Sequence, residues 1–290
     1  LTAAGCEYTT RENITLADTI NTALTAPTTI CPSESVTISV ATTSQATYTF
    51  YVGGTQQQES SSATFTTTGI SRTSSVVITI TNASGCSETV STVINVVDLE
   101  DGGSITPTNS TICMGGDSPS ISNLVSATLE DYSAAASITY FWEQSFDTVS
   151  WTTVAGTESS LAAAAVTGIV TTTYFRRGAE VVNGDSGSCE ILYTSPITVN
   201  VEASITPTIS SSTGAFTFCV GDSPTFESQT TPAGVVTYTW SYFNGTSTVT
   251  STGTGTTTEV TIVANGYIQL DILTAAGCEY TTRENITLAD

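Results

Sequence analysis

The sequence predicts an all-β chain that folds into several β-sandwich domains arranged in a linear string. Apolar and polar residues alternate with a period of two in stretches such as Val76–Ile80, Ile197–Val201 and Ile268–Ile272, the pattern of strands with one buried and one exposed face. Turn signals such as Asn244-Gly245 separate these stretches. Only Leu161–Val166 suggests a helix, and this segment is too short to form one alone.

The two ends of the chain carry an identical 18-residue segment, LTAAGCEYTTRENITLAD, at Leu1–Asp18 and at Leu273–Asp290. Chance does not produce such an identity, and an old duplication would have diverged. The chain is therefore expected to show slightly more than one period of a longer tandem array, with a period of 272 residues. The alternative is an artefact in which one segment has been written twice.

A weaker repeat lies inside this period, and the cysteines mark it. Similar short segments follow Cys31, Cys113 and Cys219, and each leads to an aromatic triplet and then to a second cysteine in a turn. One period thus holds three units of about 91 residues, the size of a single β-sandwich. The predicted domains are a terminal hairpin and strand of a preceding domain at 1–22, and three domains at 23–101, 102–202 and 203–290.

The composition excludes most enzyme chemistry. The formal net charge is -21, and the five basic residues are all arginine, so lysine and histidine are both absent. Without histidine there is no Ser-His-Asp or Cys-His arrangement, and without lysine there is no Schiff base or phosphate-binding P-loop. The acidic surface repels phosphate backbones, which disfavours nucleic acid as a partner. We expect no enzymatic activity.

The seven cysteines predict structural disulfides within each domain. The expected pairs are Cys31–Cys86, Cys113–Cys189 and Cys219–Cys278, each acting as a staple near one end of its sandwich. The remaining Cys6 is the repeat equivalent of Cys278, so its expected partner is the Cys219 equivalent of the preceding repeat. Structural disulfides indicate an oxidising compartment, hence a secreted, extracellular or cell-surface location. The alternative is buried, reduced thiols, which behave as small hydrophobes.

The order of motifs resembles a known group of proteins. Gly-Asp-Ser-Pro follows the first cysteine at Gly116–Pro119 and Gly221–Pro224, and an aromatic strand, a Thr-rich stretch, a second cysteine and a final strand come after it. This order resembles the immunoglobulin-like and PKD-like repeats of giant Bacteroidota surface proteins, including gliding-motility adhesins. The first unit departs from it, with Phe50 in place of Trp. The resemblance implies tandem immunoglobulin-like β-sandwiches, export through the cell envelope, and a role in surface filaments or adhesins.

Three large aromatic residues are expected in the cores. Phe50, Trp142 and Trp240 occupy the equivalent aromatic strand of the three units, where large rings dominate sandwich packing. The alternative is a platform of exposed tryptophan rings that stacks on sugars.

Five acidic residues are weak candidates for calcium ligands, and no other cofactor is expected. They lie in the joint before the second domain and in the two Gly-Asp-Ser-Pro segments: Asp98, Glu100, Asp101, Asp117 and Asp222. Calcium needs six to eight oxygen ligands, and these acids are not spaced like a calcium loop. The simpler interpretation is that the aspartates cap turns.

Two threonines are candidates for O-glycosylation. Thr19 and Thr148 each lie in an Asp-Thr-aliphatic triplet, the acceptor signal of the group that the chain resembles.

The favoured hypothesis is a structural role, in which repeated domains form the shaft of an extracellular filament or adhesin stalk. The expected partners are the preceding and following repeats, end to end, with lateral packing between filaments as a further possibility. The alternative is a carbohydrate- or cell-surface-binding module that acts through avidity. Consecutive repeats belong either to one polypeptide or to separate subunits that exchange strands. No segment here is apolar enough for direct membrane insertion.

Overall fold

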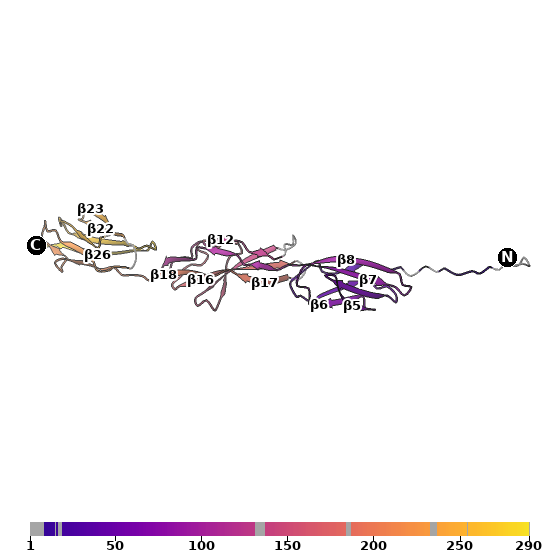
Figure 1. Ribbon diagram of the computed structural model, residues 1–290. Coiled ribbons are helices and arrows are strands. Elements are labelled where there is room, and N and C mark those ends of the chain that lie inside the picture. The colour runs from indigo at the N-terminus through magenta and orange to yellow at the C-terminus, as the bar shows by residue number, and fades with distance from the viewer. Residues whose placement is uncertain are drawn as a thin grey trace, which may run out of the picture. The chain divides into compact units, whose positions relative to one another are not determined.

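The computed structural model describes residues 9–14, 16, 19–130, 137–183, 187–232, 237–253 and 255–289. Every regular element in these residues is a β-strand, apart from short turns (Figure 1). The chain forms two compact units. The first unit comprises Leu1–Gly103, Ala127–Thr139 and Ala179–Tyr193, and the second comprises Ser104–Ser126, Tyr140–Gly178 and Thr194–Asp290.

The first sandwich lies in the first unit and has two sheets. One sheet has the order β1-β3-β6 and the other β2-β8-β7-β4-β5. Alternate residues of these strands point inward, as in β7, whose inward positions are all buried, and they form a single aliphatic and aromatic core. The strands are β1 (Leu24–Thr25), β2 (Thr29–Ile30), β3 (Val36–Val40), β4 (Thr47–Val52), β5 (Thr55–Ser60), β6 (Thr64–Thr67), β7 (Ser74–Thr81) and β8 (Ser87–Val96).

The middle sandwich contributes strands to both units. Its main sheet has the order β11-β18-β16-β14-β15, with β17 paired to β16, and two short sheets, β10-β12 and β9-β13, accompany it. The strands are β9 (Leu99–Asp101), β10 (Ser104–Thr106), β11 (Asn109–Cys113), β12 (Ser122–Val125), β13 (Thr128–Leu129), β14 (Ser137–Ser145), β15 (Thr152–Val154), β16 (Thr173–Asn183), β17 (Gly187–Tyr193) and β18 (Ile197–Glu202).

The third sandwich lies in the second unit and repeats the plan of the first. Its sheets have the orders β20-β26-β25-β22-β23 and β19-β21-β24. The strands are β19 (Ile209–Ser211), β20 (Thr217–Phe218), β21 (Thr225–Ser228), β22 (Thr237–Phe243), β23 (Thr248–Gly253), β24 (Thr257–Glu259), β25 (Gly266–Leu273) and β26 (Glu279–Leu288). The predicted all-β fold of tandem sandwiches is confirmed.

The three large aromatic residues lie in the cores. The exposed fraction is 0% for Phe50, 0% for Trp142 and 3% for Trp240. Phe50 is opposite Ile78 and Trp240 is opposite Leu270 in the central strand pairs, so these rings pack inside the sheets and offer no surface for stacking on a sugar. The Trp142 indole N–H donates to the Glu158 carbonyl at 3.0 Å, which satisfies the polar end of the ring.

The three sandwiches share one topological feature, a parallel pairing between two of their strands. The strand that leads to the first cysteine (β2, β11 or β20), here called the opening strand, pairs with the last strand of the sandwich (β8, β18 or β26), here called the closing strand. Ile30 of β2 is opposite Val96 of β8, and Phe218 of β20 is opposite Leu288 of β26. In the middle sandwich the whole of β11 runs parallel to β18. The two strands therefore end at the same pole of the sandwich, and the residue that follows the opening strand lies beside the end of the closing strand.

The middle sandwich also buries a charged side chain, Arg177 of β16, which is 0% exposed. Its guanidinium Nη1 donates to Asn123 Oδ1 at 2.6 Å and to the Ser159 carbonyl at 2.9 Å, and its Nη2 donates to the Val125 carbonyl at 3.1 Å. The guanidinium carbon also lies 4.6 Å from the centre of the Tyr140 ring. Burial lowers the pKa of Arg177. By these polar contacts the Arg177 side chain links β16 to β12 and to Ser159, which lies in the segment between β15 and β16.

We expect the replacement Arg177→Met to destabilise the middle sandwich by about 2–4 kcal/mol, because it leaves buried carbonyl and amide acceptors without their donor. Urea unfolding combined with amide hydrogen exchange of β16 measures this loss. The matched control is Arg176→Met, which removes the partly exposed ion pair of Arg176 with Glu143 and should cost at most about 1 kcal/mol. Equal effects of the two replacements would contradict a structural role of the buried guanidinium.

Candidate functional site: disulfides between consecutive sandwiches

The first cysteine of each sandwich lies at or directly after the end of the opening strand. Cys31 and Cys219 directly follow β2 and β20, and Cys113 is the last residue of β11. The backbone is held the same way in the first and third sandwiches. The Cys31 N–H donates to Glu34 Oε2 at 3.0 Å, and the Cys219 N–H donates to Asp222 Oδ2 at 2.8 Å. An acidic residue three positions after the cysteine closes the turn in both cases.

The second cysteine lies in or near the hairpin that leads into the closing strand. Cys86 follows β7 and precedes β8, and Cys278 follows β25 and precedes β26. The two turns have the same hydrogen bonds: the Cys86 N–H donates to Asn82 Oδ1 at 3.0 Å, and the Cys278 N–H donates to Thr274 Oγ1 at 3.2 Å. The return bonds also match, from the Asn82 N–H to the Cys86 carbonyl and from the Thr274 N–H to the Cys278 carbonyl, both 3.0 Å.

The two cysteines of one sandwich therefore lie at opposite ends of the closing strand. In the first sandwich β8 separates them and has 10 residues, so at 3.3 Å per residue the separation is about 30 Å. A disulfide needs Cα atoms about 4.4–6.8 Å apart. Strand β26 has the same length in the third sandwich, and the same exclusion applies there.

The predicted pairs within domains are wrong. Cys31–Cys86, Cys113–Cys189 and Cys219–Cys278 do not form, and the structure instead joins Cys31 to Cys189 and Cys113 to Cys278. The expected staple at one end of each sandwich fails because the parallel opening strand carries its cysteine to the far end of the closing strand. Cys6, expected to bond to a preceding repeat, lies outside the described residues.

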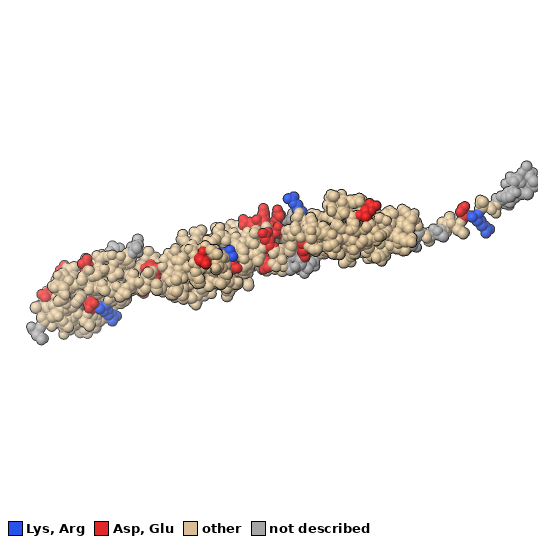
Figure 2. Space-filling view, turned by 90° about the horizontal axis from the view of Figure 1, so that it is seen from below, with Lys and Arg blue, Asp and Glu red and all other residues tan. Residues whose placement is uncertain are grey.

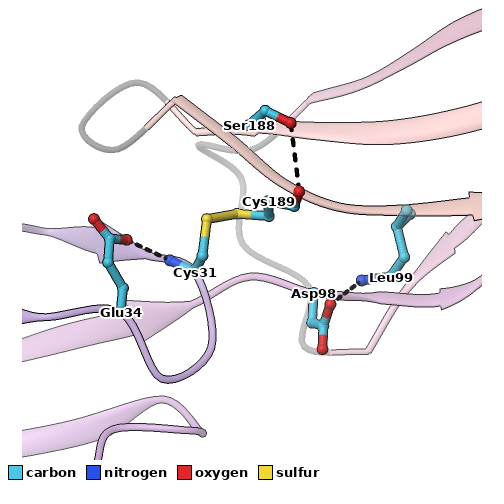
Figure 3. Close-up of a disulfide and its surroundings, with 6 residues drawn as sticks. All are labelled: Cys31, Glu34, Asp98, Leu99, Ser188 and Cys189. Carbon is cyan, nitrogen blue, oxygen red and sulfur yellow. Dashed lines mark hydrogen bonds between the residues drawn. A yellow bond between two sulfur atoms is a disulfide. The ribbon is translucent and has the colours of Figure 1, made fainter. Parts of the chain in front are cut away.

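The first disulfide belongs to the first compact unit (Figure 3). Cys31, in the turn after β2 of the first sandwich, bonds to Cys189 on β17 of the middle sandwich, with a Cα–Cα distance of 5.3 Å. Figure 3 shows the Glu34 carboxylate at the Cys31 N–H and the joint residues Asp98 and Leu99 nearby. The Asp98 carboxylate accepts from the Leu99 N–H at 2.9 Å, which fixes the chain where it leaves the first sandwich.

The second disulfide belongs to the second compact unit. Cys113 at the end of β11 bonds to Cys278 in the β25–β26 hairpin of the third sandwich, with a Cα–Cα distance of 5.5 Å. Hydrogen bonds support the same joint: Thr274 Oγ1 donates to Glu202 Oε2 at 3.0 Å, and the Tyr280 hydroxyl donates to the Ala203 carbonyl at 3.4 Å. Desolvation raises the pKa of Tyr280, and the negative charge of Glu202 adds to that shift.

Both disulfides follow one rule: the first cysteine of a sandwich bonds to the second cysteine of the next sandwich. Cys86 and Cys219 are reduced and exposed. The sequence showed which cysteines are equivalent but not which end of a sandwich each occupies. The short opening strand before each first cysteine could have located that cysteine. It would have done so only with the knowledge that this strand pairs in parallel with the closing strand.

The candidate calcium ligands do not form a site among the described residues. No group of three or more acidic or cysteine side chains able to hold a metal is found there. Several of the carboxylates accept backbone hydrogen bonds instead: Asp101 from Gly103, Asp117 from Gly168 and Asp222 from Cys219. Glu100 lies within 3.5 Å of Thr128 Oγ1. The aspartates act as turn caps, the simpler of the two interpretations.

The two glycosylation candidates are both exposed. Thr19 lies before the first strand of the first sandwich. Thr148 lies in a tight turn and has a φ of 63°, in the left-handed region. Its hydroxyl donates to the Asp147 carbonyl at 2.6 Å. Asp147 Oδ1 accepts from the Val149 and Ser150 N–H groups at 2.8 and 2.7 Å, and these hydrogen bonds lower the pKa of Asp147 to about 2.

The surface carries little charge of either sign over most of the face in Figure 2, where uncharged residues predominate and basic residues are few. One basic residue of the middle sandwich, Arg176, is already engaged. It pairs with Glu143 at 2.6 Å and lies 4.1 Å from the centre of the Trp151 ring. Within the described part of the chain, no helix has the length and apolar character needed to cross a membrane.

Peptide mapping of the 290-residue chain under non-reducing conditions should recover Cys31 linked to Cys189 and Cys113 linked to Cys278, because among the described cysteines these are the pairs that lie within bonding distance. Alkylation of the isolated, folded 290-residue chain should label Cys86 and Cys219. Recovery of Cys31–Cys86 or Cys219–Cys278 would contradict the parallel pairing of opening and closing strands.

The turn at Asp147 should hold above pH 4 and loosen as the pH falls toward 2. The pKa of the Asp147 carboxyl is lowered in the folded protein from 3.8 to about 2. Its contribution to the stability of the turn is therefore complete above pH 3.8, and it is lost as protonation removes the negative charge that strengthens its hydrogen bonds. Amide exchange of Val149 and Ser150 measures this opening. The replacement Asp147→Asn should show faster exchange at neutral pH and no acid transition; a transition that persists in it would assign the effect to another group.

Part of the chain matches a known family model, and several solved structures are similar to the chain at low identity. Residues 101–203 match a family described as a domain of unknown function (DUF8696), and this range covers the middle sandwich. No curated protein matches the sequence. Among solved structures, titin domains A168–A170 share 14% identity over 92% of this chain and 98% of that chain, with a TM-score of 0.35. The insect immune protein hemolin shares 10% identity over 93% and 77%, with a TM-score of 0.33.

A third similar structure is longer than this chain. Immunoglobulin domains 1–5 of Sidekick-1 share 13% identity over 92% of this chain, with a TM-score of 0.27, and the chain spans 59% of that structure. The chain is a series of immunoglobulin-like β-sandwiches, and disulfides join each sandwich to the next.

Proposed function

We propose that the chain is the 272-residue structural repeat unit of an extracellular filament or adhesin stalk, whose function is to span distance from the cell surface. The observation that carries this proposal is the pair of disulfides. Each of them joins the first cysteine of one sandwich to the second cysteine of the next sandwich. At each of these joints the disulfide adds a second covalent link to the backbone, and this link shortens the length of chain that tension can extend.

The two disulfides overlap along the chain, and this limits how far it can lengthen. When the sandwiches unfold, tension can pass from Cys31 to Cys189, along the chain to Cys113, and across to Cys278. Only the 76 residues between Cys113 and Cys189 lengthen on this route, to about 260 Å at 3.4 Å per residue. Without disulfides the segment from Cys31 to Cys278 would reach about 840 Å.

The disulfides are typical of proteins in oxidising compartments, which supports an extracellular or cell-surface location. The loops they close span 158 and 165 residues, and each closure stabilises the folded state by about 5 kcal/mol on chain-entropy grounds. The absence of lysine and histidine from the sequence supports a role without catalysis.

The geometry favours spanning over sugar binding. The rings that a stacking platform would use, those of Trp142 and Trp240, are buried. The proposed partners are the preceding and following repeats, joined end to end, and other filaments alongside. The exposed Thr19 and Thr148 are the proposed positions for glycans on the surface.

Single-molecule stretching of the 290-residue chain between its ends tests the mechanical part of the proposal. The fully extended length should increase by roughly 600 Å when reductant opens both disulfides, since the chain between Cys31 and Cys278 is then released. The variant Cys86→Ser is the matched control, because Cys86 is reduced and exposed, and it should leave the oxidised length unchanged. An oxidised chain that extends as far as the reduced one contradicts the proposal.

Gold labelling of intact cells with an antibody against this chain tests the location. Labels should lie at the surface and along projecting filaments. Labelling only after the cells are opened would overturn the extracellular part of the proposal, whatever the stretching experiment shows.

A further inference from the structure

Two cysteines of the 272-residue period, Cys86 and Cys219, have no disulfide partner among the residues that the structure describes. Both are exposed and reduced, although the other four cysteines of the period are bonded in two disulfides that follow one rule. The two are of opposite kinds. Cys219 is the first cysteine of the third sandwich, and Cys86 is the second cysteine of the first sandwich.

Cys219 has the same backbone surroundings as Cys31, the bonded first cysteine of the first sandwich. Like Cys31, it directly follows a strand that runs parallel to the end of the closing strand, and its N–H is held by an acidic side chain three residues later. The residue after the closing strand donates to the carbonyl of the residue before the cysteine in both cases, from Val97 to Ile30 at 3.0 Å and from Ala289 to Phe218 at 2.8 Å.

Cys86 likewise lies in the same type of hairpin turn as Cys278. Its hairpin turn repeats the three hydrogen bonds of the Cys278 turn, including the bond from the glycine before the cysteine, Gly85 to Asn82 and Gly277 to Thr274, both 3.0 Å. The difference is in the partner. Cys278 is bonded and 2% exposed, whereas Cys86 is exposed.

The duplicated segment gives the order of sandwiches in an array. Residues 281–288 end β26 of the third sandwich, and the identical residues 9–16 lead into the first sandwich. The two copies differ in burial: Ile286 is 1% exposed, whereas Ile14 is 94% exposed. In an array with a 272-residue period, the sandwich that carries Cys219 is therefore followed directly by a copy of the sandwich that carries Cys86.

We propose that Cys219 forms a disulfide with Cys86 of the following copy of the period, so that every joint of the array carries the same bond. This inference rests on the proposed repeat function and deepens it by naming the residues that join one period to the next. With it, all six cysteines of a period are paired. The rule that bonds Cys31 to Cys189 and Cys113 to Cys278 then continues without a break along the array.

The bond forms by thiol–disulfide exchange with an external low-molecular-weight or protein disulfide, RSSR. The Cys219 thiolate attacks RSSR, forms a mixed disulfide and releases one RS⁻. The Cys86 thiolate of the following copy then attacks the Cys219 sulfur and releases the second RS⁻. Two protein thiols are oxidised to one disulfide, RSSR is reduced to two RSH, and the two protons pass to the released thiolates.

The test uses a chain of two consecutive periods, residues 1–290 followed by a second copy of residues 19–290, oxidised with glutathione disulfide. Non-reducing peptide mapping should recover a peptide pair that links Cys219 to Cys86, and the native chain should show one disulfide more than the four that two separate periods supply. Titration should accordingly find two thiols fewer than in the chain without the link.

Two matched variants identify which copy of Cys86 is used. The change Cys86→Ser in the second copy should abolish the Cys219–Cys86 peptide pair, and the same change in the first copy should leave its yield unchanged. Loss of the pair in the first-copy variant, or an oxidised chain in which Cys219 stays reduced or bonds to Cys278, would overturn the inference. The proposed function is judged separately, by stretching the 290-residue chain and by surface labelling of intact cells, so either idea can fail alone.

Discussion

The parallel pairing between the opening and closing strands of each sandwich is the constraint on which the covalent structure depends. It carries the first cysteine to the pole where the closing strand ends, while the second cysteine stays in the hairpin where that strand begins. The closing strands of the first and third sandwiches are 10 residues long, which places the two thiols about 30 Å apart. No side-chain rotation spans that distance, so the two cysteines of one sandwich cannot bond to each other, and both disulfides join consecutive sandwiches.

A chain joined in this way divides its stability between two kinds of interaction. Within each sandwich, inward residues such as Phe50 and Trp240 bury apolar surface, and this burial supplies most of the favourable free energy of folding. Between sandwiches, disulfides and hydrogen bonds, such as that from Thr274 to Glu202, hold the joints.

The middle sandwich departs from the plan of its neighbours. Its second cysteine, Cys189, lies on a strand of its own, β17, and not in a hairpin turn before the closing strand. Its core is interrupted by the buried guanidinium of Arg177, which is held by carbonyl and amide oxygens. This is also the region that matches the family of unknown function. A buried, hydrogen-bonded arginine fixes the relative position of its contacts more narrowly than an aliphatic side chain would.

The sequence alone determined the strand content, the tandem sandwiches, the equivalence of the cysteines and the burial of Phe50 and Trp142, because alternation, turn residues and internal repeats are local properties of a chain. It did not determine the disulfide partners. Pairing depends on which strand lies beside which and in what direction, and the two-residue strands β2 and β20 leave almost no local trace of their parallel pairing. The burial of Arg177 also had no local signal, since its acceptors lie as many as 54 residues away in sequence. Only the tertiary structure brings such residues together, because their contacts form across sheets and between consecutive sandwiches.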